Sequence, residues 1–257
     1  MKNQKTEQRQ AEIVSFLRRH GTLSVNELAE FLSVSDETIR RDAQHLAGMG
    51  DVLKLHGALS LPHHFGEVPF ERRMRENAEA KVAVARAALS LVEDGDSLIL
   101  DTGSTTCIFA RELRAKRDLT VITNSTEIAR TLAYVKGNKV YLAGGELNAD
   151  DGGSFGPTAV DFIAKFSVKH TFISITAIDA IKGPMDATLA DAEFANMAMT
   201  RGAHCFILAD SSKFNQSALV SVCRFSDVDA IVTERVPGPE YSVALQDAGT
   251  QLLVATT

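Results

Sequence analysis

Cysteine is scarce in this sequence. The chain contains three, Cys107, Cys205 and Cys223, and none belongs to a C-x-x-C pair. An odd number of widely spaced thiols excludes the disulfide framework of small secreted domains and indicates a reduced, cytoplasmic protein. The seven histidines lack the spacing of metal ligands, so we expect no metal site and no cofactor.

Long apolar runs and a basic excess are also missing. No stretch of about 18 apolar residues occurs, which excludes a transmembrane helix, and the opening MKNQKTEQRQ lacks the apolar core of a signal peptide. A net charge of −6 and a pI near 5.7 exclude a protein that coats nucleic acid or a membrane by bulk attraction. A local basic patch remains compatible with these values.

The chain is long enough for two domains. Its 257 residues are 45% hydrophobic and 23% charged, which is ordinary for a globular protein with a sizeable core. The apolar pattern divides it unevenly. We predict a small helical domain over 1–61, a polar linker with two prolines over 62–80, and a larger α/β domain over 81–257.

The first domain shows a pattern of three helices and a hairpin. Apolar residues at helical spacing predict a helix over 7–20. Ser24 and Glu27 form the capping-box pattern of a second helix, and Ser35 is placed to cap a third. Residues 51–61 predict a short hairpin. This order indicates a winged helix-turn-helix, whose third helix enters the major groove of DNA.

Two adjacent arginines, Arg40 and Arg41, lie on the predicted third helix. Residues 1–60 hold eight basic and eight acidic side chains, so affinity for DNA requires a focused patch, to which Lys54 adds. The alternative is a solvated charge pair on a helix that only packs. The capped helices and the hairpin favour DNA. We expect these side chains at the DNA: Ser35, Glu37, Thr38, Arg40, Arg41, Lys54 and His56.

From residue 97 onward the pattern alternates strand, loop and helix. Seven short apolar runs, SLIL, LTVIT, KVYLA, HTFISITAI, HCFILA, AIVT and QLLVA, are separated by polar loops and helical segments. This order indicates an α/β domain with a mainly parallel sheet. A ligand is expected in the crevice at the carboxyl ends of its strands.

The loop DTGSTT joins a predicted strand to a helix. Its backbone N–H groups and the hydroxyls of Ser104, Thr105 and Thr106 suit a phosphate or carboxylate, although it is neither a Walker loop nor G-x-G-x-x-G. An ordinary capped turn explains the same residues. Cys107 follows just inside the helix, where the pattern is compatible with a reactive thiol or a buried structural one.

Three later stretches carry further candidates. LAGGEL contains Gly144, Gly145 and Glu146, ADAEF contains Glu193, and ADSSKF contains Lys213. Glycines let a ligand approach the backbone, and a lysine neutralises phosphate. Glu193 and Lys213 are also residue types of sugar-phosphate isomerases, or simply a surface ion pair.

The N-terminal residues resemble a known family. The pattern VS..TIRRD..L...G.....HG is similar to the hallmark of the DeoR family of bacterial transcriptional regulators. It occurs here at Val34, Ser35, Thr38 to Asp42, Leu46, Gly50, His56 and Gly57. The resemblance implies that the segment 34–41 is the recognition element.

The chain from about residue 75 resembles the DeoR effector domain, which shares the ribose-5-phosphate isomerase type of α/β fold. The stretch AGGEL...DGG..G is most similar to the family's glycerol-3-phosphate regulon repressors. Glycines usual in the family are replaced by Ser174 and Ala177, and a Lys-Arg pair by Met197 and Ala198. The resemblance implies a phosphorylated-sugar site at Asp101, Gly103, Ser104, Thr105, Thr106, Thr123, Asn124, Gly144, Gly145, Glu146, Asp179, Glu193 and Lys213.

Together these features predict a DNA-binding repressor of a carbohydrate or glycerol catabolic operon. A phosphorylated metabolite, first of all glycerol-3-phosphate, is expected to release it from operator DNA. Repeated half-sites imply a homodimer or tetramer, in the bacterial cytoplasm and away from membranes. Three alternatives stay open: a sugar-phosphate isomerase-like enzyme, a repressor with a different sugar-phosphate effector, and a DNA-bound scaffold without a working pocket. The N-terminal domain argues against an enzyme, which has no need of it.

Overall fold

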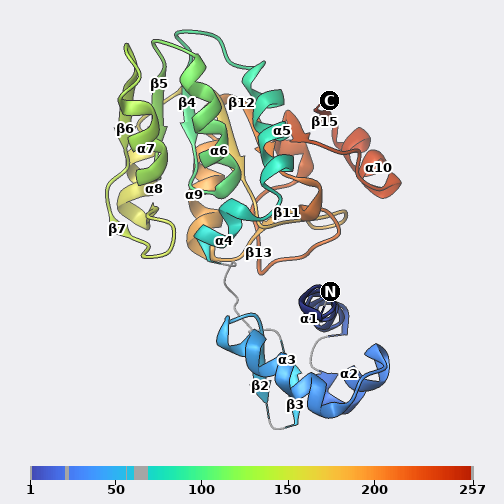
Figure 1. The fold of residues 1–257 in the computed structure, drawn as a ribbon. Helices are drawn as coiled ribbons and strands as arrows, with labels where there is room; N and C mark the ends of the chain where they lie inside the picture. Colours follow the sequence, from blue (N-terminus) through green and yellow to red (C-terminus); the bar gives the residue numbers. More distant parts are fainter. Residues whose placement is uncertain (1, 21–22, 56, 61–68, 256–257) are drawn as a thin grey trace. The chain divides into compact units, whose positions relative to one another are not determined.

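The chain folds into two compact units, Met1–Gly66 and Glu67–Thr257 (Figure 1). The computed structural model describes residues 2–20, 23–55, 57–60 and 69–255. In those ranges no helix is both long and apolar enough to cross a membrane. The same residues contain no cluster of three His, Cys, Asp or Glu side chains placed to hold a metal ion.

The first unit contains the predicted three helices and hairpin. Strand β3 pairs antiparallel with both β2 and β1, which completes a small three-stranded wing. The described elements are α1 (Lys2–His20), β1 (Leu23–Ser24), α2 (Val25–Leu32), α3 (Asp36–Gly48), β2 (Leu53–Leu55) and β3 (Ala58–Ser60). The winged helix-turn-helix is therefore confirmed.

Local chemistry sets the ends of α2 and α3. Ser24 and Glu27 form the predicted capping box: the Glu27 N–H donates to Ser24 Oγ at 3.1 Å and the Ser24 N–H donates to Glu27 Oε2 at 2.7 Å. Ser35 caps α3 by accepting from the Thr38 N–H at 3.3 Å. These bonds satisfy N–H groups that a helix start leaves without partners.

A buried ion pair holds α3 against α1. Arg9 donates to both carboxylate oxygens of Asp42, at 2.5 and 3.2 Å, and Gln10 donates to the same carboxylate at 3.2 Å. Asp42 is 3% exposed. It lies among the apolar residues that α3 buries, Ile39, Ala43 and Leu46, so the orientation of α3 depends on this pair.

The second unit is built on a seven-stranded parallel sheet in the order β15-β14-β12-β9-β4-β5-β6. Every strand matches an apolar run of the sequence, which confirms the mainly parallel sheet. The bounds are β4 (Ser97–Leu100), β5 (Thr120–Thr123), β6 (Lys139–Leu142), β9 (Val168–Ser174), β12 (Gly202–Leu208), β14 (Ala230–Thr233) and β15 (Gln251–Val254).

Helices cover both faces of this sheet, so each strand is buried on two sides. One face packs on α5 (Ala78–Leu89), α6 (Ser104–Glu112) and α7 (Thr126–Ala133), which lie side by side in Figure 1. The other packs on α8 (Pro157–Ile163), α9 (Leu189–Met199) and α10 (Pro239–Ala248). Successive residues of one strand serve opposite cores: Leu98 and Leu100 face the first set, and Ile99 the second.

The order of strands places a topological switch between β4 and β9. The chain runs from β4 outward through β5 to β6, and then returns to the other side of β4 as β9. Loops at the carboxyl ends of β4 and β9 consequently leave in opposite directions. In open parallel sheets such a divergence makes a ligand crevice.

Short elements surround the carboxyl edge. An antiparallel sheet joins β10 (Ala177–Asp179), β11 (Gly183–Asp186) and β13 (Val220–Ser221). A hairpin pairs β7 (Glu146–Leu147) with β8 (Ser154–Phe155). Three single-turn helices complete the unit: Leu113–Ala115, Ser211–Lys213 and Phe225–Asp227.

The segment expected as a linker, 62–80, differs from that expectation in its second half. Residues 62–68 lie outside the described residues. Beyond Pro69, the short helix α4 (Phe70–Arg75) and the start of α5 belong to the second unit. Glu, Arg, Met and Ala dominate this stretch and favour helix, so its polarity reflects an exposed helix rather than an extended connection.

We predict that Asp42→Ala destabilises the first unit by roughly 2 kcal/mol, because it removes hydrogen bonds to a charged group. Urea unfolding of the whole protein can follow the two units with different probes. Tyrosine fluorescence reports on the second unit alone, because Tyr134, Tyr141 and Tyr241 all lie there and the chain has no tryptophan. In the Asp42→Ala variant, part of the far-UV circular dichroism signal should be lost at lower urea than in the parent protein. The urea midpoint of the tyrosine fluorescence transition should stay the same. His45→Ala, exposed on the same helix, is the control; equal shifts in both probes would contradict the assignment.

Candidate functional site

A groove on the first unit collects the predicted DNA-binding side chains. It measures about 540 Å³ and lies between the exposed face of α3 and the hairpin. Glu37, Arg40, Arg41 and Gln44 line it from α3, and Lys54 lines it from β2. Their spacing along α3 is that of one helical face, opposite the buried Ile39 and Leu46. Three positive side chains therefore converge on one groove.

The other predicted DNA contacts lie at the start of α3 or outside the residues that the structure describes. Ser35 Oγ is 2.9 Å from Thr38 Oγ1, and both side chains take part in capping the helix. Their position leaves the N-terminus of α3 facing outward, with Ser35 exposed. His56 lies outside the described residues.

Asp42 is a structural residue that the sequence analysis did not single out. It does not line the groove, but its ion pair with Arg9 holds α3, which carries Arg40 and Arg41, against α1. A signal was available: position 42 falls on the same helical face as Ile39 and Leu46, where a carboxylate requires a partner.

The second unit has a small pocket at the switch between β4 and β9. Its volume is about 20 Å³, close to the room for one water molecule. Asp101 follows β4, Asn124 follows β5, and Ser174 ends β9. The complete lining is Arg73, Asp101, Thr102, Asn124, Phe155, Ser174, Ile175, Asp186, Asp191 and Phe194.

Asp101 and Ser174 join the two diverging strands. The Ser174 N–H donates to Asp101 Oδ2 at 2.9 Å, and the Ser174 hydroxyl donates to the same oxygen at 3.2 Å. Burial raises the pKa of the Asp101 carboxyl well above its ordinary value; these hydrogen bonds oppose the shift, and the charge of Asp186 adds to it. Ionisation of the Asp101 carboxyl is therefore unfavourable in the folded protein.

Polar atoms without partners point to a ligand with hydroxyl groups. Thr102 Oγ1 and Asn124 Oδ1 are buried and have no hydrogen-bond partner within the described part of the chain. Asp186 accepts from the Thr176 N–H at 2.9 Å, and Asp191 accepts from the Thr188 hydroxyl at the start of α9. Donors and acceptors of both kinds surround a small volume, as in sites for polar small molecules.

The predicted loop DTGSTT opens α6 beside this pocket. Gly103 precedes the helix, and a Cβ added there would lie 1.8 Å from Ser174 Oγ, so any larger residue would require Ser174 to shift. Thr106 Oγ1 donates to the Asp101 carbonyl at 3.0 Å, which fixes the loop. Ser104 and Thr105 are buried in the same turn, and Thr123 accepts from the Ser125 N–H at 3.0 Å.

Several predicted effector residues lie away from the pocket lining. Gly144, Gly145 and Glu146 are exposed at the start of the β7–β8 hairpin. Asp179 accepts from the N–H groups of Ile181 and Lys182, both at 2.9 Å, and these bonds lower the pKa of its carboxyl. It stabilises a tight turn between β10 and β11.

Glu193 also faces elsewhere. It is exposed on α9 and lines a separate groove of about 490 Å³ together with Asn196 and Met197. Neighbouring residues of α9 turn inward instead: Asp191 and Phe194 line the pocket. No ion pair joins Glu193 to Lys213 among the residues that the structure describes, so the acid–base pair considered from the sequence is not assembled.

Lys213 belongs to a basic cluster, Arg73, Lys81 and Lys213, that the sequence analysis did not assemble. Lys81 is 3% exposed and its ammonium donates to the Arg73 carbonyl. Burial lowers the pKa of Lys81, the charges of Lys213 and Arg73 lower it further, and Asp210 raises it. One signal was present: Lys81 lies on the buried face of α5 with Val84 and Ala88.

Cys107 is a structural thiol. It is 1% exposed, and burial raises its pKa to about 12. Its Sγ lies 3.8 Å from Ser125 Oγ, between α6 and the start of α7. A thiolate does not form there near neutral pH, which decides between the two interpretations left open by the sequence.

Family models match both units. Residues 9–65 match the DeoR-like helix-turn-helix domain, and residues 76–235 match the DeoR C terminal sensor domain. The chain belongs to the DeoR family. The resemblance noted in the sequence is therefore confirmed, and the two matched ranges fall one in each compact unit.

Full-length DeoR relatives extend the match to almost the whole chain. The glycerol-3-phosphate regulon repressor of Escherichia coli is 31% identical over 248 residues, covering 96% of this chain and 98% of the relative. The transcriptional repressor AccR of Agrobacterium fabrum is 32% identical, covering 89% and 90%. The repressor GlcR of Bacillus subtilis is 28% identical, covering 96% of each.

Solved structures are more distant. Ribose 5-phosphate isomerase A of Methanocaldococcus jannaschii matches with a TM-score of 0.40 and 18% identity, over 54% of this chain and 55% of that one. The eIF2B beta subunit of Chaetomium thermophilum matches with a TM-score of 0.47 and 13% identity, over 86% and 60%. Likenesses at this level say nothing about chemistry.

We predict that Asp101→Asn stabilises the DeoR sensor unit at pH 7.5. A carboxyl whose folded-state pKa is raised contributes stability below its ordinary pKa and loses it as the pH rises through the folded-state value. Asparagine does not ionise, so the variant should unfold at higher urea than the parent at pH 7.5, with a smaller gain at pH 5.

Tyrosine fluorescence measures this transition, and Asp247→Asn, an exposed acid on α10, is the matched control. An Asp101→Asn variant that loses the same stability at both pH values would show that the carboxylate stabilises the native fold.

Proposed function

We propose that this protein is a transcriptional repressor whose hold on operator DNA is released by a phosphorylated carbohydrate metabolite. The observation that carries the proposal is the groove of the first unit, where Arg40, Arg41 and Lys54 meet beside the outward face of α3. Positive side chains in such a groove bind phosphates and leave α3 to contact base edges. The proposed DNA contacts are Ser35, Glu37, Thr38, Arg40, Arg41, Lys54 and His56.

The pocket at the switch supports the effector half of the proposal. Its buried partnerless atoms, Thr102 Oγ1 and Asn124 Oδ1, suit the hydroxyls of a carbohydrate. The basic cluster of Arg73, Lys81 and Lys213 suits a phosphate, and the N-terminus of α6 adds a positive dipole. A relative in Escherichia coli is named for glycerol-3-phosphate, which makes this compound the first to test.

Binding without catalysis fits the site better than isomerase chemistry. Glu193, the base expected for an enzyme, is exposed on a different groove from the pocket. The family relatives are named as repressors. We propose that the protein has no enzymatic turnover, and an assay with pentose and hexose phosphates tests this directly.

Operators of winged helix-turn-helix proteins consist of repeated half-sites, so we propose a homodimer or tetramer in the bacterial cytoplasm. The identity of the effector depends on the positions where this chain departs from the residues usual in the DeoR family, which are Ser174, Ala177, Met197 and Ala198. Ser174 has the clearest effect, because its hydroxyl occupies the space above Gly103 and narrows the approach to α6.

We predict that Arg40→Ala weakens binding to DNA from upstream of the protein's own gene by about tenfold, the cost of a charge-assisted contact. Fluorescence anisotropy at several salt concentrations measures it. If Arg40 contacts a phosphate, the slope of log K against log salt should decrease by about 0.9, and Arg40→Lys should retain most affinity. If it contacts a guanine edge, Arg40→Lys should lose affinity mainly for the specific site.

His45→Ala is the control for Arg40, since His45 is exposed on the same helix but does not line the groove. A folded Arg40→Ala protein with unchanged affinity and salt slope would remove Arg40 from the DNA interface.

We predict that glycerol-3-phosphate releases the protein from this DNA in the same anisotropy assay. The expected result is at least a tenfold loss of operator affinity at saturating ligand, a coupling of about 1.4 kcal/mol. Fructose, glucose and ribose phosphates are titrated in parallel, with unphosphorylated glycerol as control. Release by a different sugar phosphate only would identify that compound as the effector and still support the repressor assignment. Release by none of the compounds would exclude phosphorylated sugars as the effector class.

A further inference from the structure

Helix α4 (Phe70–Arg75) lies outside both ranges matched by the DeoR models, 9–65 and 76–235. It is the first helix of the second unit, and it follows the DNA-binding unit directly along the chain. One of its side chains, Arg73, nevertheless lines the pocket at the switch. A residue next to the DNA-binding unit in sequence is thus part of the candidate effector site.

The Asp150 carboxylate, in the loop between β7 and β8, holds the start of α4. The Phe70 N–H donates to Asp150 Oδ2 at 2.9 Å and to Oδ1 at 3.1 Å. Pro69, the residue before the helix, provides no side-chain cap, so Asp150 takes that role from across the pocket rim. Asp150 thereby connects α4 to an exposed hairpin.

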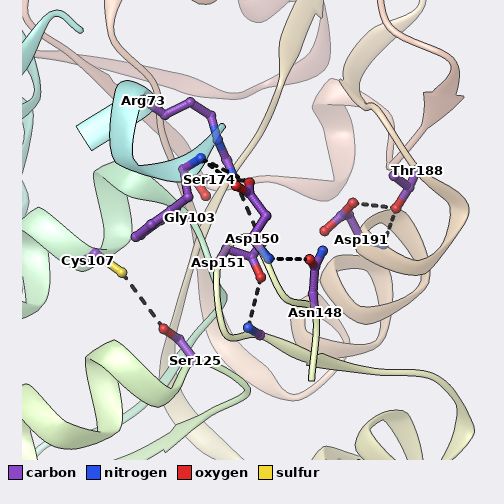
Figure 2. Close-up of polar contacts among 12 residues, drawn as sticks. Arg73, Gly103, Cys107, Ser125, Asn148, Asp150, Asp151, Ser174, Thr188 and Asp191 are labelled. Carbon is purple, nitrogen blue, oxygen red and sulfur yellow. Dashed lines mark hydrogen bonds and ion pairs between the residues drawn. The ribbon is translucent and has the colours of Figure 1, made fainter. Parts of the chain in front are cut away.

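The carboxylates of Asp150 and its neighbour Asp151 hold Arg73. Its Nη2 lies 3.6 Å from Asp150 Oδ2 and 3.8 Å from Asp151 Oδ2, and Figure 2 shows its side chain extending toward both. The guanidinium carbon also lies 5.3 Å from the centre of the Phe70 ring. Both distances are longer than the roughly 2.7–2.9 Å of a charge-assisted hydrogen bond, and a guanidinium is suited to bind a phosphate in bidentate geometry.

The electrostatics of the pocket require a cation if an anion is to bind. Asp101, Asp186 and Asp191 line it with carboxyl groups, and Arg73 is the cationic side chain in the described lining. Arg73 is 11% exposed, so water screens its charge little. A volume of about 20 Å³ does not admit a sugar phosphate while Arg73 keeps this position.

A junction at Asn77 separates α4 from α5, although the Lys81 ammonium of α5 donates to the Arg73 carbonyl and Phe70 and Met74 of α4 pack against the core. Asn77 adopts a left-handed conformation, φ 52°, between α4 and α5. Its side-chain amide donates to Ser212 Oγ at 3.1 Å and to Asp210 Oδ1 at 3.4 Å, which fixes the start of α5 on the second unit. The start of α4 depends instead on Asp150.

We propose that Arg73 binds the phosphate or carboxylate of the effector, and that this exchange frees α4 from Asp150 and Asp151. The proposal rests on the proposed function, since it assigns a ligand-binding and signalling role within that site. Operator affinity falls when α4, which follows the first unit along the chain, is released. The effector acts because it binds the released form better than the form that Asp150 and Asp151 hold.

The first test is Arg73→Gln in the operator anisotropy assay with glycerol-3-phosphate and the sugar-phosphate panel. The concentration for half-maximal release should rise at least tenfold, because a charge-assisted contact with the anion is lost. Arg75→Gln is the matched control: Arg75 lies on the same helix, is 83% exposed and pairs with Glu71. If the parent protein is released and Arg73→Gln is released at the same concentration, the inference is wrong while the proposed function stands.

The second test needs no effector. Asp150→Asn with Asp151→Asn keeps the size of both side chains, removes their charges and weakens their hold on Arg73 and Phe70. Operator affinity should fall about threefold or more without any ligand, and Asp161→Asn, an exposed acid on α8, should leave it unchanged. Unchanged operator affinity in the double variant would overturn the proposed coupling even if no panel compound acts on the parent protein.

Inorganic phosphate tests Arg73 independently of the effector's carbohydrate part. Hydrogen exchange of the α4 amides should accelerate with phosphate in the parent protein and in Arg75→Gln, but not in Arg73→Gln. An absence of acceleration in the parent, or equal acceleration in Arg73→Gln, would show that Arg73 is not the anion-binding residue.

Discussion

The contact between Asp101 and Ser174 is the interaction on which the sensor unit's site depends. It joins the ends of β4 and β9, the two strands from which the chain diverges. Ser174 also occupies the space beside Gly103, so the start of α6 approaches closely. The cost is a buried carboxyl whose pKa burial raises well above its ordinary value. Proteins retain a destabilising buried carboxyl of this kind where it contributes to function.

The first unit depends on one buried charge in a similar way. Asp42 lies on the apolar side of α3 and is neutralised by Arg9 of α1. This pairing leaves the opposite side of the helix free to present Arg40 and Arg41 beside Lys54. In both units a buried carboxylate joins two elements beside the candidate site: α1 with α3 in the first unit, and the ends of β4 and β9 in the second.

Much of the fold was predictable because burial patterns are local. Ser24, Glu27 and Ser35 marked helix starts, and the seven apolar runs marked the seven strands, since each strand is buried on both faces. The site was only partly predictable. Asp101 and Asn124, which the family resemblance implied, line the pocket together with Ser174, which was noted only as a departure from the family. Arg73 and Asp186 were not predicted, and Glu193 was predicted at the site although it lines another groove.

The sequence by itself determined the two-domain plan, the winged helix-turn-helix, the parallel sheet and the basic face of α3, because each follows from periodicity and capping within a few residues. Tertiary structure decided which strand ends meet, and therefore which side chains share a pocket. Strand order is set by packing between residues about 70 apart, as with Asp101 and Ser174, and no local pattern encodes it. The same long-range packing brings α4 to Asp150 and places the Arg73 side chain in the lining of the pocket.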